Sequence, residues 1–167
     1  LNRSVCSIIL RGRHERAIQS ILELPADHIR KHQNIWAHLI LAQLDRGAFH
    51  DAKFQLERLW GGGQINQLAP ELQASTLGYL KCFQAAILTH TELNAKRVIE
   101  LTTEAVDLLR DTDSLGLSIA HGHFGAAQLH LGNLSSAAQS LDQAIELSKK
   151  TDYDLIYLLW FSYRAQV

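Results

Sequence analysis

Residues 132–148 read GNLSSAAQSLDQAIELS, and this stretch decides the fold. Its apolar residues recur at intervals of three and four, which places them in one stripe along a helix. Gly132 suits the turn before that helix, because glycine adopts left-handed backbone conformations at little cost. Ala137 is small enough for a second helix to cross closely, and Leu141 fills the groove one turn further on. The stretch therefore predicts the second helix of a tightly packed helical hairpin.

The same pattern occurs three times in the chain: a glycine, an alanine five positions later, and an aliphatic residue four positions after the alanine. In chain order the copies are Gly12–Ala17–Ile21, Gly47–Ala52–Leu56 and Gly132–Ala137–Leu141. The interval from Gly47 to Gly132 is more than twice that from Gly12 to Gly47, which leaves room for a divergent copy with longer helices. Since a hairpin that buries one side needs a neighbour to bury the other, the series predicts a stack of hairpins.

Helical periodicity extends along almost the whole chain, with short breaks that make successive helices antiparallel neighbours. The expected helices are 3–11, 14–24, 26–46 with a break near His32, 48–60, 69–90, 94–111, 114–131 and 134–150. A ninth begins near Asp152. The run Gly61 to Gly63 is predicted to form a mobile turn, and Asp113 or Ser114 to cap the helix near residue 114. No sustained period-two alternation predicts strands.

Composition excludes several classes of protein. The 167 residues carry a formal net charge of −1, with 47% hydrophobic and 20% charged residues. The chain is too apolar for disorder and lacks the basic excess that drives nucleic-acid binding, so we predict no direct nucleic-acid contact. The longest apolar runs, such as residues 35–42, are too short for a membrane span. Cys6 and Cys82 make no disulfide framework, which favours a cytoplasmic location.

Catalytic and metal-binding patterns are absent from the sequence. We find no phosphate-binding loop, no Cys-x-x-Cys, no His-Glu-x-x-His and no Gly-x-Ser-x-Gly, so we predict that the chain is not an enzyme. Nine histidines raise the question of a metal site. His123 and His130 share a helix face, but His121 points elsewhere, and zinc needs several converging ligands. We therefore predict no metal site.

The repeated phrase resembles the tetratricopeptide repeat, whose first helix carries Trp-x2-Leu-Gly-x2-Tyr and whose second carries Ala-x3-Phe. Trp36 and Leu39 match the first helix of one copy, although Ile40 and Gln43 replace its glycine and tyrosine. The closing proline of the repeat is absent. The positions that fit the repeat are Gly12, Ala17, Trp36, Leu39, Gly47, Ala52, Gly125, Gly132, Ala137 and Ala144. The resemblance implies an all-α fold: one helical-repeat domain over residues 1–167, in which about four antiparallel hairpins form a right-handed superhelix, or α-solenoid.

A narrower resemblance covers most of the chain. Five stretches are similar to the helical region of the large ATP-binding LuxR-type (MalT-like) transcription activators: Leu24–Ala26, Asn34–Ala37, Gly47–Leu59, Gly125–Ala127 and Gly132–Ser148. In that family an upstream domain binds ATP and a downstream helix-turn-helix binds DNA. The resemblance implies that this stretch binds no cofactor itself. It implies instead that the array receives a small-molecule inducer or a regulatory protein and helps self-association. The lack of methionine, even at position 1, also predicts an internal part of a longer protein.

Projection of the expected first helices onto the concave side of such an array gives a candidate binding groove. The residues that would line it are Asn34, Leu41, Asp45, Tyr79, Phe83, Ala126 and His130. A groove of this kind would hold an inducer or partner through one or two polar anchors on an apolar floor. The alternative is a stand-alone tetratricopeptide adaptor that scaffolds protein partners. The scarcity of Lys and Arg in the projected groove disfavours recognition of a peptide carboxylate.

The last segment is rich in aromatic residues at helical spacing, among them Tyr157, Trp160 and Phe161. One interpretation is an aromatic docking face for a peptide or sugar. The other, which we favour, is the first helix of a further repeat, because a solenoid needs a polar cap at its end and this segment has none. In the second case we expect an exposed apolar patch and a tendency to self-associate.

Overall fold

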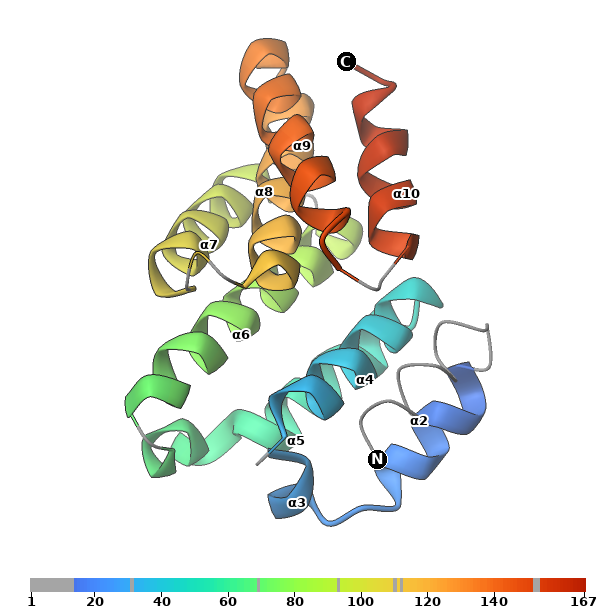
Figure 1. The fold of residues 1–167 in the computed structure, drawn as a ribbon, viewed down its shortest axis with the longest axis vertical. Helices are drawn as coiled ribbons and strands as arrows, with labels where there is room; N and C mark the ends of the chain where they lie inside the picture. Colours follow the sequence, from blue (N-terminus) through green and yellow to red (C-terminus); the bar gives the residue numbers. More distant parts are fainter. Residues whose placement is uncertain are drawn as a thin grey trace. The chain divides into compact units, whose positions relative to one another are not determined.

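A computed structural model of the chain describes residues 14–30, 32–68, 70–92, 94–109, 111, 113–151 and 154–167. Within these residues the fold is all-helical and contains no strand, which confirms the predicted all-α class (Figure 1). The elements are α2 (His14–Leu22), α3 (Ala26–Arg30), α4 (Gln33–Asp45), α5 (Phe49–Trp60), η1 (Gly61–Gln67), α6 (Pro70–Thr91), α7 (Ala95–Leu108), α8 (Ser114–His130), α9 (Leu134–Ser148) and α10 (Asp154–Arg164). The helix expected at 3–11, together with Gly12, lies outside the described residues.

Most expected helix boundaries lie close to those in the structure. The long helix expected at 26–46 is divided near His32, as predicted, into α3 and α4. The turn expected at Gly61 to Gly63 is wrong, because these residues open the 3-10 helix η1 directly after α5. A 3-10 turn continues backbone hydrogen bonding beyond the end of an α-helix, which a loose turn would not do.

Two hairpins close with the same backbone motif. Gly47 has φ +71° after α4, and Gly132 has φ +78° after α8. At the first turn the N–H of Ala48 donates to the carbonyl of Gln43, and that of Gly47 to Leu44, both at 2.9 Å. The equivalent bonds, Asn133 to Gln128 and Gly132 to Leu129, measure 2.9 and 3.0 Å. This is the Schellman ending, in which a left-handed glycine lets its own N–H and that of the next residue donate to carbonyls at the end of the helix.

The chain divides into two compact units, one ending at Ala69 and the other beginning at Pro70. In the first unit, α4 packs against α2, α3 and α5. The indole rings of Trp36 and Trp60 meet edge to face across the α4–α5 hairpin, with centroids 5.4 Å apart. Both rings are buried, as is Leu39 on α4. The single repeat domain expected over residues 1–167 stays a prediction.

In the second unit, each helix from α6 to α10 packs against the next one in the chain. In addition, α8 contacts both α6 and α10. Ala85, Val98, Leu101 and Ala127 form a buried cluster that joins α6, α7 and α8. Figure 1 shows α8, α9 and α10 side by side. The N-terminus of α8 is capped by Asp113, whose carboxylate accepts a hydrogen bond from the N–H of Gly116 at 3.0 Å.

Candidate functional site

The hairpin of α8 and α9 is held by a close helix crossing. A Cβ atom added at Gly125 would lie only 2.7 Å from Leu141 Cγ and 3.2 Å from the carbonyl oxygen of Ala137. Ala137 and Leu141 are completely buried. Nearer the N-terminus of α8, the hydroxyl of Ser118 donates to the carbonyl of Ala144 at 2.9 Å. Small residues therefore line α8 where α9 crosses it, and the Leu141 side chain fills the space that Gly125 leaves.

A second close contact joins α8 to α10. A Cβ atom at Gly122 would lie 2.2–2.4 Å from three atoms of the Trp160 indole. The indole is 1% exposed, and its N–H donates to the Ser118 hydroxyl at 3.1 Å. Ser118 thus accepts from α10 while it donates to α9, so that one hydroxyl links three helices. Sequence reasoning missed this link, although the small residues of α8 at 118, 122 and 125 mark it.

A buried histidine lies against the same indole. The His123 ring meets the ring of Trp160 edge to face at 5.0 Å and that of His90 from α6 at 6.0 Å. Its Nδ1 atom is buried without a hydrogen-bond partner. Burial, with a smaller contribution from His90, lowers the pKa of His123 to about 3. Burial also lowers the pKa of His90. Both imidazoles are consequently neutral near pH 7, and His123 acts as an aromatic packing residue between helices.

A polar cluster ties α6 to the start of α8. The hydroxyl of Tyr79 donates to Asp113 at 2.7 Å, and Cys82 Sγ lies 3.5 Å from the carbonyl oxygen of Gly116. Burial raises the pKa of the Tyr79 hydroxyl and of the Cys82 thiol, and the nearby Asp113 carboxylate adds to both shifts. Both groups therefore stay protonated at neutral pH, and a protonated thiol is a weak nucleophile. The cluster is suited to holding helices together rather than to covalent chemistry.

The residues projected to line a groove divide into two groups in the structure. Leu41, Tyr79, Phe83 and Ala126 are buried, whereas Asp45 and His130 are exposed. The side chain of Asn34 lies outside the described residues. A ligand cannot reach a buried side chain in this conformation, so the projection has to be corrected for the four buried residues. The physical reason is that α4, α6 and α8 are apolar on nearly every side, and helix periodicity cannot then identify an open face.

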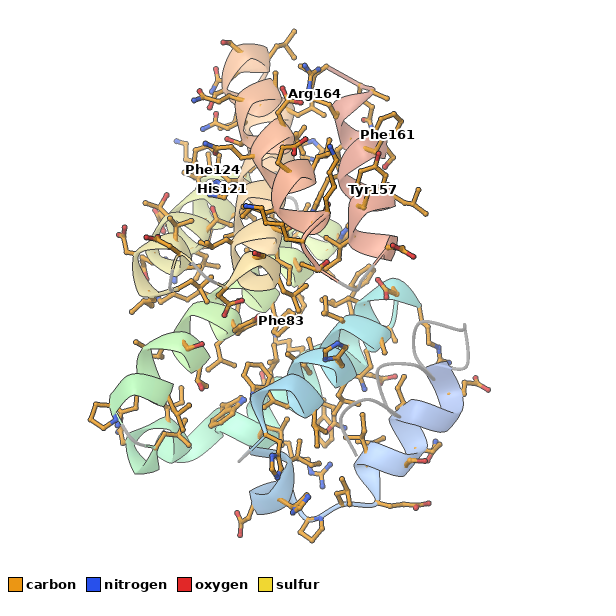
Figure 2. The ribbon with its side chains drawn as sticks, in the orientation of Figure 1. Phe83, His121, Phe124, Tyr157, Phe161 and Arg164 are labelled. Atoms are coloured by element: carbon orange, nitrogen blue, oxygen red, sulfur yellow. The ribbon has the colours of Figure 1, made fainter. Side chains whose placement is uncertain are left out.

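The largest exposed apolar side chains of the second unit include two on α10. Leu158 and Phe161 are 57% and 56% exposed. Phe161 stacks with the half-buried Tyr157, with ring centroids 6.1 Å apart and planes at 25°. Figure 2 shows the aromatic pair on α10 together with Arg164, whose guanidinium donates to Asp142 of α9 at 2.8 Å. This ion pair links α10 to α9 at the surface, and the Leu158 and Phe161 side chains stay exposed.

Comparisons with known proteins give no match: no protein-family model, no curated protein and no solved structure is significantly similar to this chain. Among the described residues, no three His, Cys, Asp or Glu side chains are placed to hold a metal ion together. None of the described helices combines the length and the apolar character that crossing a membrane requires.

Proposed function

We propose that this chain is a tetratricopeptide-like repeat module that receives an effector or a regulatory protein within a LuxR-type transcription activator. The observation that carries the repeat assignment is a close helix crossing that recurs in two successive hairpins. A Cβ atom added at Gly78 of α6 would lie 2.7 Å from Leu109 Cγ, and one added at Gly125 of α8 would lie 2.7 Å from Leu141 Cγ. In both crossings the next residue approached is the alanine four positions before that leucine, through its carbonyl oxygen: Ala105 in the first and Ala137 in the second.

The packing order supports an α-solenoid. In a stack of hairpins the first helix of each hairpin touches its own second helix, the preceding second helix and the first helices on either side. Helix α8 packs in this way, against α9, α7, α6 and α10. A first helix surrounded by others has to be apolar nearly all round, which α8 is. The same Schellman ending at Gly47 and Gly132 supports a common hairpin plan for the two units.

Such a module would act by population shift rather than by chemistry. The buried Cys82 and Tyr79 are protonated and the buried His123 is neutral, so these three groups serve packing between helices and not nucleophilic chemistry. An effector that binds one curvature of the stack more tightly than another would shift the activator between closed and assembly-competent states. An exposed polar anchor for such an effector in the second unit is His130.

Two experiments test the proposal. The coding sequence around this stretch is expected to contain a phosphate-binding loop upstream and a helix-turn-helix downstream; lack of both would refute the activator assignment. A thermal-shift screen of the full-length protein against sugars and other small inducers is expected to give one class of stabilising ligand. His130→Ala should weaken that stabilisation, whereas Glu92→Ala, which changes an exposed residue of the same unit just after α6, serves as the matched control.

The second candidate is a stand-alone adaptor that scaffolds protein partners. The exposed stack of Tyr157 and Phe161 favours it, because aromatic side chains are enriched where proteins bind one another. Affinity capture with the whole chain would then give one dominant protein partner that is lost with Phe161→Ala. A stabilising small molecule together with no such partner would instead favour the activator module.

A further inference from the structure

The contact between α8 and α10 is built around one buried imidazole. The His123 ring meets the Trp160 indole edge to face, with the two centroids 5.0 Å apart, and meets the ring of His90 from α6 at 6.0 Å. The indole in turn lies against Gly122 and donates its N–H to the Ser118 hydroxyl. We call these five residues the aromatic joint: His90, Ser118, Gly122, His123 and Trp160.

The aromatic joint accepts His123 only as a neutral ring. The residue is 4% exposed, and its Nδ1 atom is buried without a hydrogen-bond partner. An imidazolium carries an N–H on both ring nitrogens, so protonation would leave a charged donor at Nδ1 with nothing to accept from it. A buried charge without a partner costs far more free energy than a buried neutral polar atom.

No carboxylate among the described residues balances a charge on His123. Of the charged and titratable groups on the helices around it, His90 alone influences the pKa of His123, and it lowers that pKa because two positive rings repel each other. On α10, the Tyr163 ring lies 6.2 Å from that of Trp160, and burial raises the pKa of its hydroxyl, which therefore stays neutral. A proton on His123 thus meets only repulsion and an apolar surrounding.

We propose that the aromatic joint is an acid-sensitive switch, in which protonation of His123 displaces the Trp160 indole and releases α10 from α8. The α8–α9 crossing at Gly125 involves neither ring, so the hairpin can stay folded while the joint opens. Helix α10 also packs on α9, where its ion pair from Arg164 to Asp142 lies at the surface. Opening would therefore change the position of α10 and uncover Ser118 and Gly122 on α8.

The direction and size of the effect follow from proton linkage. The pKa of His123 is about 3 in the docked state, against 6.5 for an exposed imidazole. Between these values the released state binds more protons, so acid favours release and neutral pH favours docking. Each pH unit below 6.5 raises the ratio of released to docked molecules by up to about tenfold. A joint that is open in about 1% of molecules at pH 7 would thus be about half open near pH 4.5.

The switch needs no effector and does not depend on the activator assignment, so it goes beyond the proposed function. Two-dimensional proton–nitrogen NMR of the indole N–H groups tests it from about pH 7.5 to about pH 4. The chain has three tryptophans, and the Trp160 signal is identified by its loss in Trp160→Phe. Trp36 and Trp60 belong to the first unit and are the internal reference.

The expected result is that the Trp160 signal alone moves in acid to the position of a solvent-exposed indole. The signals of Trp36 and Trp60, and the helix content from circular dichroism, should stay unchanged over the same range. A Trp160 signal that does not move, or that moves only together with a loss of helix, would overturn the proposal, because the joint would then not open within a folded chain.

Two variants identify the group that takes up the proton. His123→Leu keeps an apolar side chain in the joint, so the Trp160 signal should stay at its neutral-pH position throughout. His121→Leu is the matched control and should behave as the wild type, because His121 is a half-buried histidine of the same helix outside the joint. The imidazole signals of the wild-type chain give a readout without substitution, since His123 should titrate at the midpoint of the Trp160 change. A different midpoint, or an unchanged transition in His123→Leu, would refute the switch.

Discussion

Replacement of Gly122 by alanine tests the packing of the second unit most severely. The added Cβ would lie 2.2–2.4 Å from Cε2, Cδ2 and Cζ2 of Trp160, far inside van der Waals contact. The indole is rigid, 1% exposed, and fixed by its hydrogen bond to Ser118. The clash therefore cannot be relieved by rotation of a flexible side-chain end. Either α10 moves away from α8 or the indole leaves its site.

The magnitude follows from three contributions. Overpacking of a well-packed core typically costs about 1–3 kcal/mol. Loss of the hydrogen bond between Trp160 and Ser118 adds about 1 kcal/mol. Alanine in place of glycine within a helix returns about 1 kcal/mol through its higher helix propensity. We expect Gly122→Ala to lower the free energy of unfolding by about 1–3 kcal/mol.

Urea denaturation followed by far-ultraviolet circular dichroism measures this change. Gly61→Ala is the matched control, because a Cβ there meets no atom within 4 Å, and its effect should be close to zero. Trp160→Leu removes the clashing ring, so the double variant with Gly122→Ala should lose less stability than the sum of the two single changes. A Gly122→Ala protein as stable as the wild type, or additive single changes, would refute the reasoning.

Three further predictions concern the same unit. Ala137→Leu should destabilise by roughly 1–3 kcal/mol, because the buried alanine faces the Gly125 crossing; a change of only a few tenths in urea denaturation would place the crossing elsewhere. Asp113→Ala should cost about 1–3 kcal/mol, through loss of the α8 cap and of the acceptor for Tyr79; chemical denaturation of Asp113→Asn, which keeps an acceptor, should show a smaller loss. Acid should destabilise the fold, because His123 has a pKa of about 3 when folded against 6.5 unfolded. Between these two pKa values the folded state binds fewer protons than the unfolded state, so acid favours unfolding. His123 therefore costs no stability above pH 6.5, and the free energy of unfolding falls by up to roughly 4–5 kcal/mol as the pH drops towards 3. His123→Leu should flatten that part of the stability-against-pH curve, and an unchanged curve would count against a buried neutral imidazole.

Local features of the fold could be predicted from the sequence because local physics sets them. The spacing of apolar residues located the helices, and a glycine between two such stripes located the turns, as at Gly47 and Gly132. Asp113 was one of two expected caps because a short acidic side chain before a helix accepts from its free N–H groups. Each of these features depends on only a few consecutive turns of the chain.

The contacts between helices could not be predicted in the same way. The bond from Trp160 to Ser118 joins residues far apart in the sequence, and no local pattern identifies its partner. The groove projection failed at Phe83 and Ala126 because a first helix surrounded by other helices has no polar side from which to read an orientation. The polar partner of a buried ring and the open side of an apolar helix both depend on tertiary packing.

The central claim is that α6, α8 and α10 are successive first helices with small residues at their crossings. Nuclear Overhauser contacts in the methyl-labelled chain test it most directly, because glycine α-protons at these crossings lie against identified side chains. The account predicts contacts from Gly125 to the Leu141 methyls, from Gly78 to the Leu109 methyls and from Gly122 to the Trp160 indole. Absence of the Gly125 and Gly78 contacts in a folded helical protein would contradict it.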